Sequence, residues 1–363
     1  LKRENFWITE AIMGAQGHDV TGFAPRPNQA KLWSYQSMAR GCESLMYFRY
    51  RGATKGAEQF CYGILDADNV KRRKFHEVQG FFNEIKNYEK ELSAPVKSEV
   101  AIVYDYDSLA AFRIQRQSFL LDCEAEMKKF HKVFFDANVP VDVISAGSTL
   151  SGYKIVILPQ MIIAKPDFQK QVKEFTENGG TLVLTFRDFV KDENNNLLFK
   201  KVLPVDFDEF AGIYVTETES LQEGQEFPLA GEEDFSCTQG EGGIFRDLLS
   251  VTDAEVLFRY NDVFFKDYAA VTKKKQKDGY VYYLGCGLDE TILKQDYAEY
   301  DTDKIMADEQ GIISEHSTDG VEIVYRESED RKIKITMNHN AFEVQNAGVT
   351  LAPFECKVEE VRK

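Results

Sequence analysis

The chain has 363 residues, which is long for one compact core and indicates two or three domains. Its 43% hydrophobic and 29% charged residues are typical of soluble globular proteins. A net charge of -16 argues against nucleic acid or an anionic membrane as the main partner. The longest apolar run, at residues 155–164, is interrupted by Pro159 and Gln160, so no membrane span is predicted.

Cysteine and histidine usage gives no sign of a metal site. The six cysteines are widely scattered without a CxxC pair, and the five histidines do not cluster. We therefore expect no metal and no cofactor, and a reduced protein of the cytoplasm. The cysteines are Cys42, Cys61, Cys123, Cys237, Cys286 and Cys356.

The first region, residues 1–95, alternates strands and helices. FWITE at 6–10 reads as a buried strand that ends in the carboxylate of Glu10. After a loop rich in glycine and proline, Asn28 is expected to cap a helix over 29–40 that stops at Gly41. SLMYFRYR at 44–51 reads as a second strand.

A second helix follows another long loop, with apolar residues at helical spacing between 75 and 92. Strand–helix alternation with long strand-to-helix loops is typical of a β/α barrel or a doubly wound sheet. In a barrel, the chemistry lies where strands end and these loops begin. Glu10 occupies such a place, although this stretch alone would equally fit an acid that turns to solvent.

The second region, residues 96–305, predicts a parallel α/β layer of the flavodoxin kind. Its expected strands are EVAIVYDYD, VPVDVIS, KIVILP and TLVLTF, with helices near 117–137 and over 167–178. From DENNN at 192 to LDETI at 292 the sequence is turn-rich and acidic, and we expect irregular structure that closes with the strand DGYVYYLGCGL.

This layer resembles the class I glutamine amidotransferase fold in outline. That family requires a nucleophilic cysteine at a strand-to-helix elbow, and TLVLTFRDF contains none. The region has no GxGxxG or P-loop motif either. We therefore interpret it as a structural or assembly domain.

The third region, residues 306–363, alternates with period two in VEIVYRES, KIKITMNHN and GVTLAPFECKVEEVR. This pattern predicts a small antiparallel β domain. It shows no catalytic motif, and His339 between two asparagines is expected in a turn.

Several motifs of the first region occur together: E-x3-G after an apolar strand, then KLW, YFR-x-R and GAEQF. In this combination, residues 5–92 resemble the last two strands of the catalytic (β/α)8 TIM barrel of glycoside hydrolase family 42 β-galactosidases. The resemblance continues more loosely through the other two regions, whose order matches that family. It implies the C-terminal end of a barrel, an α/β trimerisation domain and a small β domain.

The resemblance implies a retaining glycosidase that acts on terminal β-D-galactosides of oligosaccharides and assembles as a homotrimer. By position in the motif, Glu10 is the nucleophile that forms the covalent glycosyl-enzyme intermediate. Phe48 matches an aromatic residue that lines the sugar site, although a plain core role stays open. Glu58 matches a carboxylate that accepts hydrogen bonds from sugar hydroxyls.

Two positions depart from the pattern of some family members. Cys61 stands where these have a histidine, and His18 stands where they have a tryptophan. Both positions line the sugar pocket in the resemblance, so His18 is a candidate sugar contact. The departures put the sugar in doubt more than the reaction, and an α-L-arabinopyranoside substrate stays open.

The family's general acid follows an asparagine on an earlier barrel strand, and no such Asn-Glu pair ends a strand here. Asn83-Glu84 falls inside a predicted helix. The chain therefore resembles the C-terminal part of the enzyme, and we expect it not to hydrolyse galactosides by itself. With two of eight barrel strands, the first region should be ordered by packing on the second region or on a neighbouring chain. A non-catalytic carbohydrate-binding or assembly scaffold is the alternative.

Overall fold

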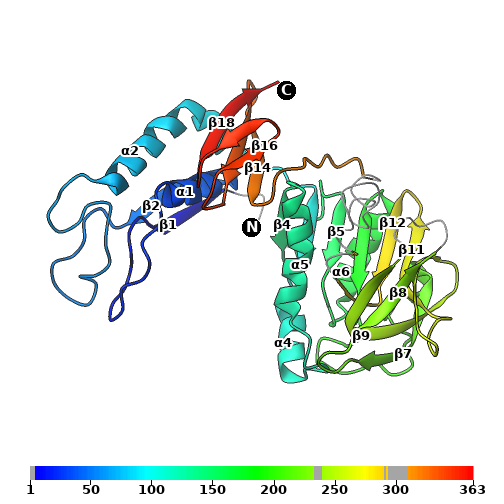
Figure 1. Ribbon diagram of the computed structural model, residues 1–363. Coiled ribbons are helices and arrows are strands. Elements are labelled where there is room, and N and C mark those ends of the chain that lie inside the picture. Colours follow the sequence, from blue (N-terminus) through cyan, green and yellow to red (C-terminus); the bar gives the residue numbers. More distant parts are fainter. Residues whose placement is uncertain (1–4, 233–238, 290–291, 293–309, 363) are drawn as a thin grey trace. The chain divides into compact units, whose positions relative to one another are not determined.

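The computed structural model describes residues 5–232, 239–289, 292 and 310–362, and its contacts divide the chain into two compact units (Figure 1). The α/β unit contains residues 98–135 and 139–314, and the terminal unit contains 2–97, 136–138 and 315–363. The first and third regions, treated as separate from sequence, thus share one unit. The predicted limit between 305 and 306, like Cys237, lies outside the described residues.

The terminal unit begins with a strand–helix–strand–helix segment. Strand β1 (Phe6–Ile12) pairs in parallel with β2 (Cys42–Phe48), and α1 (Gln29–Ala39) connects them. Then follow α2 (Arg73–Ile85), the 3-10 turn Lys86–Tyr88 and α3 (Glu89–Ser93). These elements fall where the apolar periodicity predicts them, and α1 ends one residue before the predicted end.

Asn28 is the N-cap residue of α1, as predicted, but without a capping hydrogen bond from its side chain. Asn28 directly precedes α1, but its φ of 65° is left-handed and its side chain caps no backbone N–H. A capping side chain reaches the first turn from an extended backbone, which Asn28 does not adopt. Its own N–H instead donates to Glu77 Oε1 at 3.1 Å.

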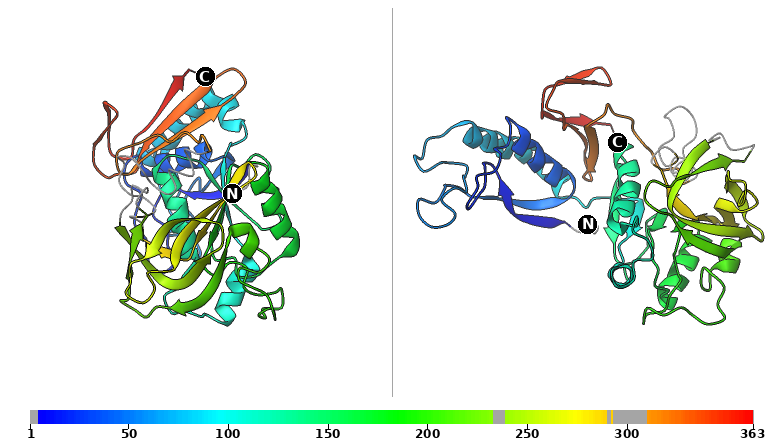
Figure 2. Two further views of the ribbon diagram at one scale, coloured as in Figure 1. Left: turned by 90° about the vertical axis from the view of Figure 1, so that its right-hand side faces the viewer. Right: turned by 60° about the horizontal axis from the view of Figure 1, so that its bottom comes forward.

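Strand β1 is more exposed to solvent than the predicted buried strand. Trp7 is 64% exposed, and Thr9 and Glu10 are also exposed, while Phe6 and Ile8 are half-buried. The cause is that β2 is the only strand paired with β1 in the described part of the chain, and α1 lies along one face of the pair (Figure 2). The prediction of a buried strand is therefore wrong for the side chains on the other face.

The last part of the chain forms the predicted antiparallel β structure. A three-stranded sheet has the order β14 (Val321–Glu327), β15 (Lys332–Asn338), β18 (Cys356–Val361), and β16 (Val344–Asn346) pairs with β17 (Val349–Leu351). Figure 1 shows α1 and α2 alongside β14 and β18. They share one core, formed by Leu32, Tyr35, Ala39, Phe81, Leu92, Val324, Ile333, Ile335, Met337 and Phe354. The first region thus packs on the third region, whereas the sequence predicted packing on the second region or on a neighbouring chain.

Arg326 joins the sheet to the ends of two helices. Its guanidinium donates to the carbonyls of Met38 and Ala39 at 2.9 and 3.1 Å, and to that of Leu92 at 2.8 Å. These carbonyls lie at the C-terminal ends of α1 and α3, where helices leave acceptors unpaired and where a cation is favourable. One buried side chain therefore fixes two helices on β14.

Glu322 makes a second buried polar link. Its side chain is fully buried and accepts from Gln36 at 2.7 Å, from Arg40 at 2.6 and 2.9 Å, and pairs with the ring of His339 at 2.9 Å. His339 was expected merely to occupy a turn. The structure gives it a contact with a buried carboxylate, which no local pattern indicates.

The α/β unit contains one mixed sheet of eleven strands. Its parallel part has the order β4, β3, β5, β6, β12, which is the flavodoxin-like arrangement. These strands are β4 (Val141–Ile144), β3 (Val100–Val103), β5 (Ile155–Leu158), β6 (Thr181–Thr185) and β12 (Gly279–Leu284). The helices are α4 (Tyr106–Ile114), α5 (Cys123–Asp136), α6 (Pro166–Glu177) and α7 (Asp208–Ala211).

Strands β3, β5 and β6 are buried along their whole length. Phe168 and Val172 of α6 pack on Val156, Leu158 and Leu182. Alternate residues of a strand point to the other face, and these are buried as well. Burial on both faces explains why KIVILP and TLVLTF read as continuous apolar runs.

The expectation of irregular structure after residue 192 is wrong. That segment contributes antiparallel strands to the same sheet: β7 (Ile213–Ser220), β8 (Phe227–Gly231), β9 (Gln239–Val251), β10 (Glu255–Tyr260) and β11 (Ala269–Gln276). The closing strand DGYVYYLGCGL was predicted, and it forms β12 and β13 (Cys286–Leu288). Exposed polar residues fill much of β7, so its sequence lacks an apolar signal. The predicted helix near 117–137 begins later, at Cys123, and α4 was not predicted.

Among the described residues, no helix has the length and apolarity that a membrane crossing requires.

Candidate functional site

The pairing of β1 with β2 contains an irregularity at Glu10. Ile8 pairs with Leu45 and Ala11 pairs with Tyr47, so two residues of β1 face one residue of β2. This is a β-bulge, a feature that redirects side chains and is frequent beside active sites. Thr9 and Glu10 form the bulge, and the Glu10 side chain is exposed.

The register also shows which face of the pair is open. Tyr47 points to α1, where its hydroxyl bonds with Ser34 Oγ at 2.7 Å and burial raises its pKa to about 12. Because neighbouring side chains of a strand point to opposite faces, Phe48 lies on the face away from α1. Glu10 and Phe48 therefore share the open face.

Phe48 and Glu58 are brought together by Arg49. The Arg49 guanidinium carbon lies 4.2 Å from the centre of the Phe48 ring. The same guanidinium forms an ion pair with the Glu58 carboxylate through Nη2 and Oε2. The sequence resemblance pointed to Phe48 and Glu58, and its YFR-x-R motif contains Arg49 but gave that residue no role.

The two strand-end loops hold each other in place. Tyr62 N–H donates to the carbonyl of Ala15 at 3.0 Å, and Gln16 Nε2 donates to the Tyr62 carbonyl at 2.9 Å. A Cβ at Gly14 would lie 2.9 Å from Tyr62 atoms, so only glycine permits this approach. The loop after β1 and the loop after β2 are thus joined by hydrogen bonds.

Cys61 and His18 lie on the two strand-end loops. The thiol of Cys61 is buried and donates to the Gly17 carbonyl at 3.5 Å, so it joins the two loops. His18 sits on the exposed turn that follows Gly17. The hydrogen bonds described here do not bring His18 into the cluster of Phe48, Arg49 and Glu58.

The α/β unit offers no nucleophile at the elbow after β6. Arg187 stands there with a φ of 68°, and its N–H donates to Asp247 Oδ2 at 3.1 Å. Burial raises the pKa of Cys123 to about 12 and also raises that of Cys286, so both thiols stay protonated. These observations argue against an amidotransferase-like reaction by the described residues.

Asp188 is the buried residue of the same elbow. Its two carboxylate oxygens accept from the backbone N–H groups of Met161 and Thr185, the latter at 2.7 Å. Burial raises the pKa of Asp188 well above its usual range. With no exposure, this carboxyl group holds the β5 and β6 ends together and cannot meet a substrate.

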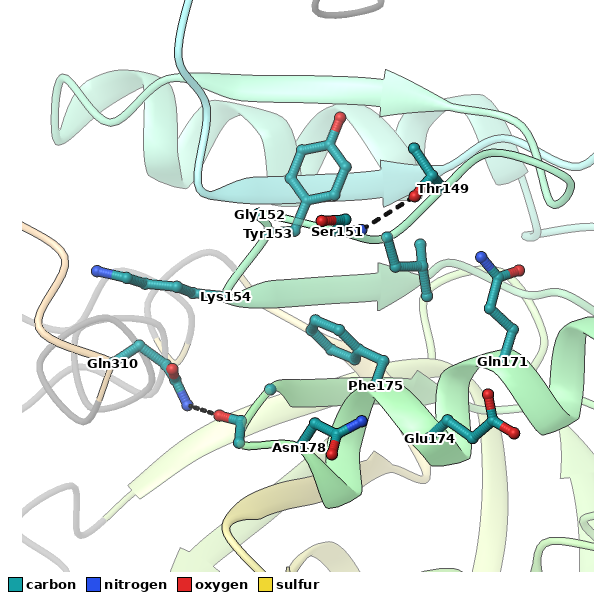
Figure 3. Close-up of a pocket in the computed structure, with 13 residues that line it drawn as sticks. Thr149, Ser151, Gly152, Tyr153, Lys154, Gln171, Glu174, Phe175, Asn178 and Gln310 are labelled. Atoms are coloured by element: carbon teal, nitrogen blue, oxygen red, sulfur yellow. Dashed lines mark hydrogen bonds between the residues drawn. The ribbon is translucent and has the colours of Figure 1, made fainter.

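A separate pocket of about 520 Å³ lies in the α/β unit at the amino ends of β5 and β6 (Figure 3). Figure 3 shows the Phe175 ring between Lys154, Asn178 and Glu174. Gln310 lines the same pocket and donates to the Gly179 carbonyl at 3.0 Å. In open parallel sheets ligands bind at the carboxyl ends of strands, so this pocket is on the wrong edge for such a site.

Within the residues that the structure describes, no group of three or more His, Cys, Asp or Glu side chains could hold a metal ion.

Two family models match the chain. Residues 98–306 match the model described as a β-galactosidase trimerisation domain, and residues 1–88 match the model described as β-galactosidase. The first match alone covers more than half of the chain.

Curated relatives carry the same name. β-Galactosidase BgaA of Clostridium cellulovorans is 34% identical over 345 residues, which are 94% of this chain and 50% of that protein. β-Galactosidase LacZ of Heyndrickxia coagulans is 27% identical over 346 residues, with 93% and 50% covered. The chain spans about half the length of the curated relatives it matches.

Solved structures show the same fold. A β-galactosidase from Bacillus circulans sp. alkalophilus superposes with a TM-score of 0.87 at 26% identity, covering 99% of this chain and 54% of that one. The GH42 β-galactosidase Gan42B superposes with a TM-score of 0.88 at 24% identity, covering 100% and 55%.

Proposed function

The chain belongs to the β-galactosidases of glycoside hydrolase family 42, and from this membership we propose that the protein it forms part of is a retaining β-galactosidase. Its substrates are terminal non-reducing β-D-galactosides of oligosaccharides. Glu10 is the nucleophile, and Phe48 and Glu58 contact the sugar. His18, on the exposed turn after Gly17, is a candidate contact with the sugar.

The observation that carries this proposal is the bulge at Glu10. It presents one carboxylate at the end of β1, on the face that also carries Phe48. A nucleophile needs a fixed backbone, which the strand pair and the interlocked loops supply. Its exposed carboxylate is accessible to a substrate, as attack requires.

In the proposed reaction, Glu10 attacks the anomeric carbon while a general acid protonates the leaving oxygen. Water then attacks the galactosyl ester, giving up a proton to the same acid residue, and galactose leaves with retained configuration. Because the chain spans about half the length of its relatives, we place the general acid in the remaining half. The β1–α1–β2–α2 segment is then the end of a (β/α)8 barrel.

We further propose that the α/β unit assembles the enzyme as a homotrimer. The match to a trimerisation domain and the lack of a catalytic elbow at Arg187 support this role. The flavodoxin-like strand order supports a likeness to glutamine amidotransferases that is architectural only. Free thiols at Cys42, Cys61 and Cys286 support a cytoplasmic location.

The test is Glu10→Ala in the full reading frame that contains this chain. Turnover of an aryl β-galactoside should fall at least about 10³-fold. Added azide should restore part of it by attacking the anomeric carbon from the vacated side, yielding the α-galactosyl azide. Glu43→Ala, an exposed acid at the start of β2, serves as the matched control and should retain activity.

The same assay separates the alternatives. An aryl α-L-arabinopyranoside has the ring configuration of galactose without the hydroxymethyl group, and faster turnover of it would change the substrate. A wild-type protein that binds galactosides but hydrolyses neither compound would point to a carbohydrate-binding scaffold. Near-normal activity of Glu10→Ala would refute the nucleophile assignment.

A further inference from the structure

Arg49 occupies an unusual place in the candidate site, because one side chain contacts two residues from different segments. Its guanidinium covers one face of the Phe48 ring at 4.2 Å and pairs with the Glu58 carboxylate. Phe48 ends β2, whereas Glu58 lies on the exposed loop that follows. No other described contact joins the Phe48 ring to the Glu58 carboxylate.

The backbone of Arg49 is itself held firmly. Its carbonyl accepts from the Ile64 N–H at 2.7 Å, and a Cβ at Gly63 would come within 2.4 Å of that carbonyl oxygen. The side chain of Arg49 therefore starts from a fixed backbone position. Its planar guanidinium can stack on a ring and bind a carboxylate at the same time. Arg49 thus covers one face of the Phe48 ring.

The pair contributes little to the stability of the fold. The side chains of Arg49 and Glu58 are 22% and 48% exposed, and ion pairs of this kind add about 0–1 kcal/mol because water screens them. Without a partner, however, a glutamate on an exposed loop samples several rotamers, and a ligand would have to order it. The effect of Arg49 should thus lie in binding.

We propose that Arg49 is a positioning residue that orients Phe48 and Glu58 together for the galactose ring. The inference rests on the proposed function and assigns a role to a residue that the resemblance leaves without one. Arg49 occupies one oxygen of Glu58, so the other oxygen is presented to the sugar hydroxyls in one orientation. None of the contacts described for Arg49 involves Glu10.

The experiment measures kcat and KM of Arg49→Gln, Glu58→Gln and the double variant in the full-length enzyme. Arg49→Gln should raise KM and lower kcat/KM about 10- to 100-fold, as losing a hydrogen bond to a charged group does. Most of kcat should persist, since none of the contacts described for Arg49 involves Glu10. Arg49→Lys should recover part of the loss, because the charge returns without the planar stacking.

The double variant decides the mechanism. If Arg49 acts through Glu58, the double variant should be no worse than the poorer single variant. Losses that multiply, or an Arg49→Gln enzyme with wild-type KM, would overturn the proposal. Arg72→Gln is the matched control, because it breaks the exposed pair with Asp68 elsewhere in the same unit. Equal losses in that control would also overturn it.

Failure of this inference differs visibly from failure of the proposed function. A wild-type enzyme that is inactive on both aryl glycosides removes the function and, with it, the role of Arg49. An active wild-type enzyme whose Glu10→Ala variant is azide-rescued, together with an unaffected Arg49→Gln variant, removes only the role of Arg49.

Discussion

Strands β5 and β6 of the α/β unit and strand β1 of the terminal unit reach different degrees of burial. Every residue of β5 and β6 is buried, while β1 exposes Trp7, Thr9 and Glu10. The α/β unit supplies neighbours for both faces of its strands, and the terminal unit supplies them for one face of β1. The strand that carries the candidate nucleophile is therefore the less buried one.

The two units also bury carboxyl groups in different ways. Asp188 is held only by backbone N–H groups and has a raised pKa, whereas Glu322 is held by Arg40 and His339 and has a lowered pKa. Burial alone disfavours the charged form of both carboxyl groups, and the positive charge beside Glu322 reverses the direction of its pKa shift. The two units can thus be tested separately through these residues.

The largest stability effect is expected for Glu322→Ala. Removing a fully buried carboxylate breaks its ion pair with Arg40 and its contact with His339, which costs about 3–5 kcal/mol. Both tryptophans, Trp7 and Trp33, lie in the terminal unit, so urea unfolding followed by tryptophan fluorescence reports on that unit. The exposed Glu359 of β18 is the control, and Glu359→Ala should leave the transition in place.

Truncating a core side chain of the α/β unit should cost slightly less stability. Leu184 in β6 is fully buried, and Leu184→Ala should destabilise the α/β unit by about 2–5 kcal/mol through lost contacts and a cavity. Hydrogen exchange of β5 and β6 measures this loss. The tryptophan transition should stay where it is, and an equal shift of that transition would show that the units unfold as one.

Acid should weaken the terminal unit through Glu322. Burial would raise the pKa of Glu322, but hydrogen bonds from His339 and Arg40 and the charge of Arg40 outweigh it, so the folded pKa lies below the usual value. The stabilisation is complete above the unfolded pKa of about 4.3 and is lost as the pH falls through the folded pKa. Tryptophan-monitored unfolding below pH 5 measures it, and Glu322→Gln should flatten the dependence.

The smallest effect is expected at the open face of β1. Trp7 is 64% exposed, so Trp7→Ser should change the stability of this chain by no more than about 0.5 kcal/mol. Trp33 remains as the fluorescent reporter. A loss above 2 kcal/mol, about the gain from fully burying a large apolar side chain, would show that β1 is packed on both faces.

Local patterns predicted the elements whose burial follows a period. The helix at 29–40, the strand at 44–51 and the apolar strands KIVILP and TLVLTF all lie within a few residues of their predicted places. Strands β7 to β11 were missed. In β7 the sequence gives no apolar alternation, because exposed polar residues fill much of the strand and its pairing with β9 makes it a strand. The start of α4 did carry a signal, since Asp105 accepts from the Ser108 N–H at 3.0 Å.

The candidate site shows the same limit. Family motifs lead to Glu10, Phe48 and Glu58, and the structure places Phe48 and Glu58 in one cluster. The bulge at Glu10 depends on how β1 registers against β2, and the contacts of Arg49 depend on where the following loop returns. Neither is encoded in a short stretch of sequence, because both arise from pairing between segments.

The terminal unit has a consequence for synthesis on the ribosome. Helices α1 and α2 bury their apolar faces on β14 and β15, and those strands emerge roughly 240–290 residues later, about 12–58 s at typical elongation rates. Throughout that interval Leu32, Tyr35 and Phe81 lack the part of their core that β14 and β15 supply. A nascent chain with such a delay is prone to aggregation, so the yield of active protein should depend on chaperones that bind exposed apolar helices.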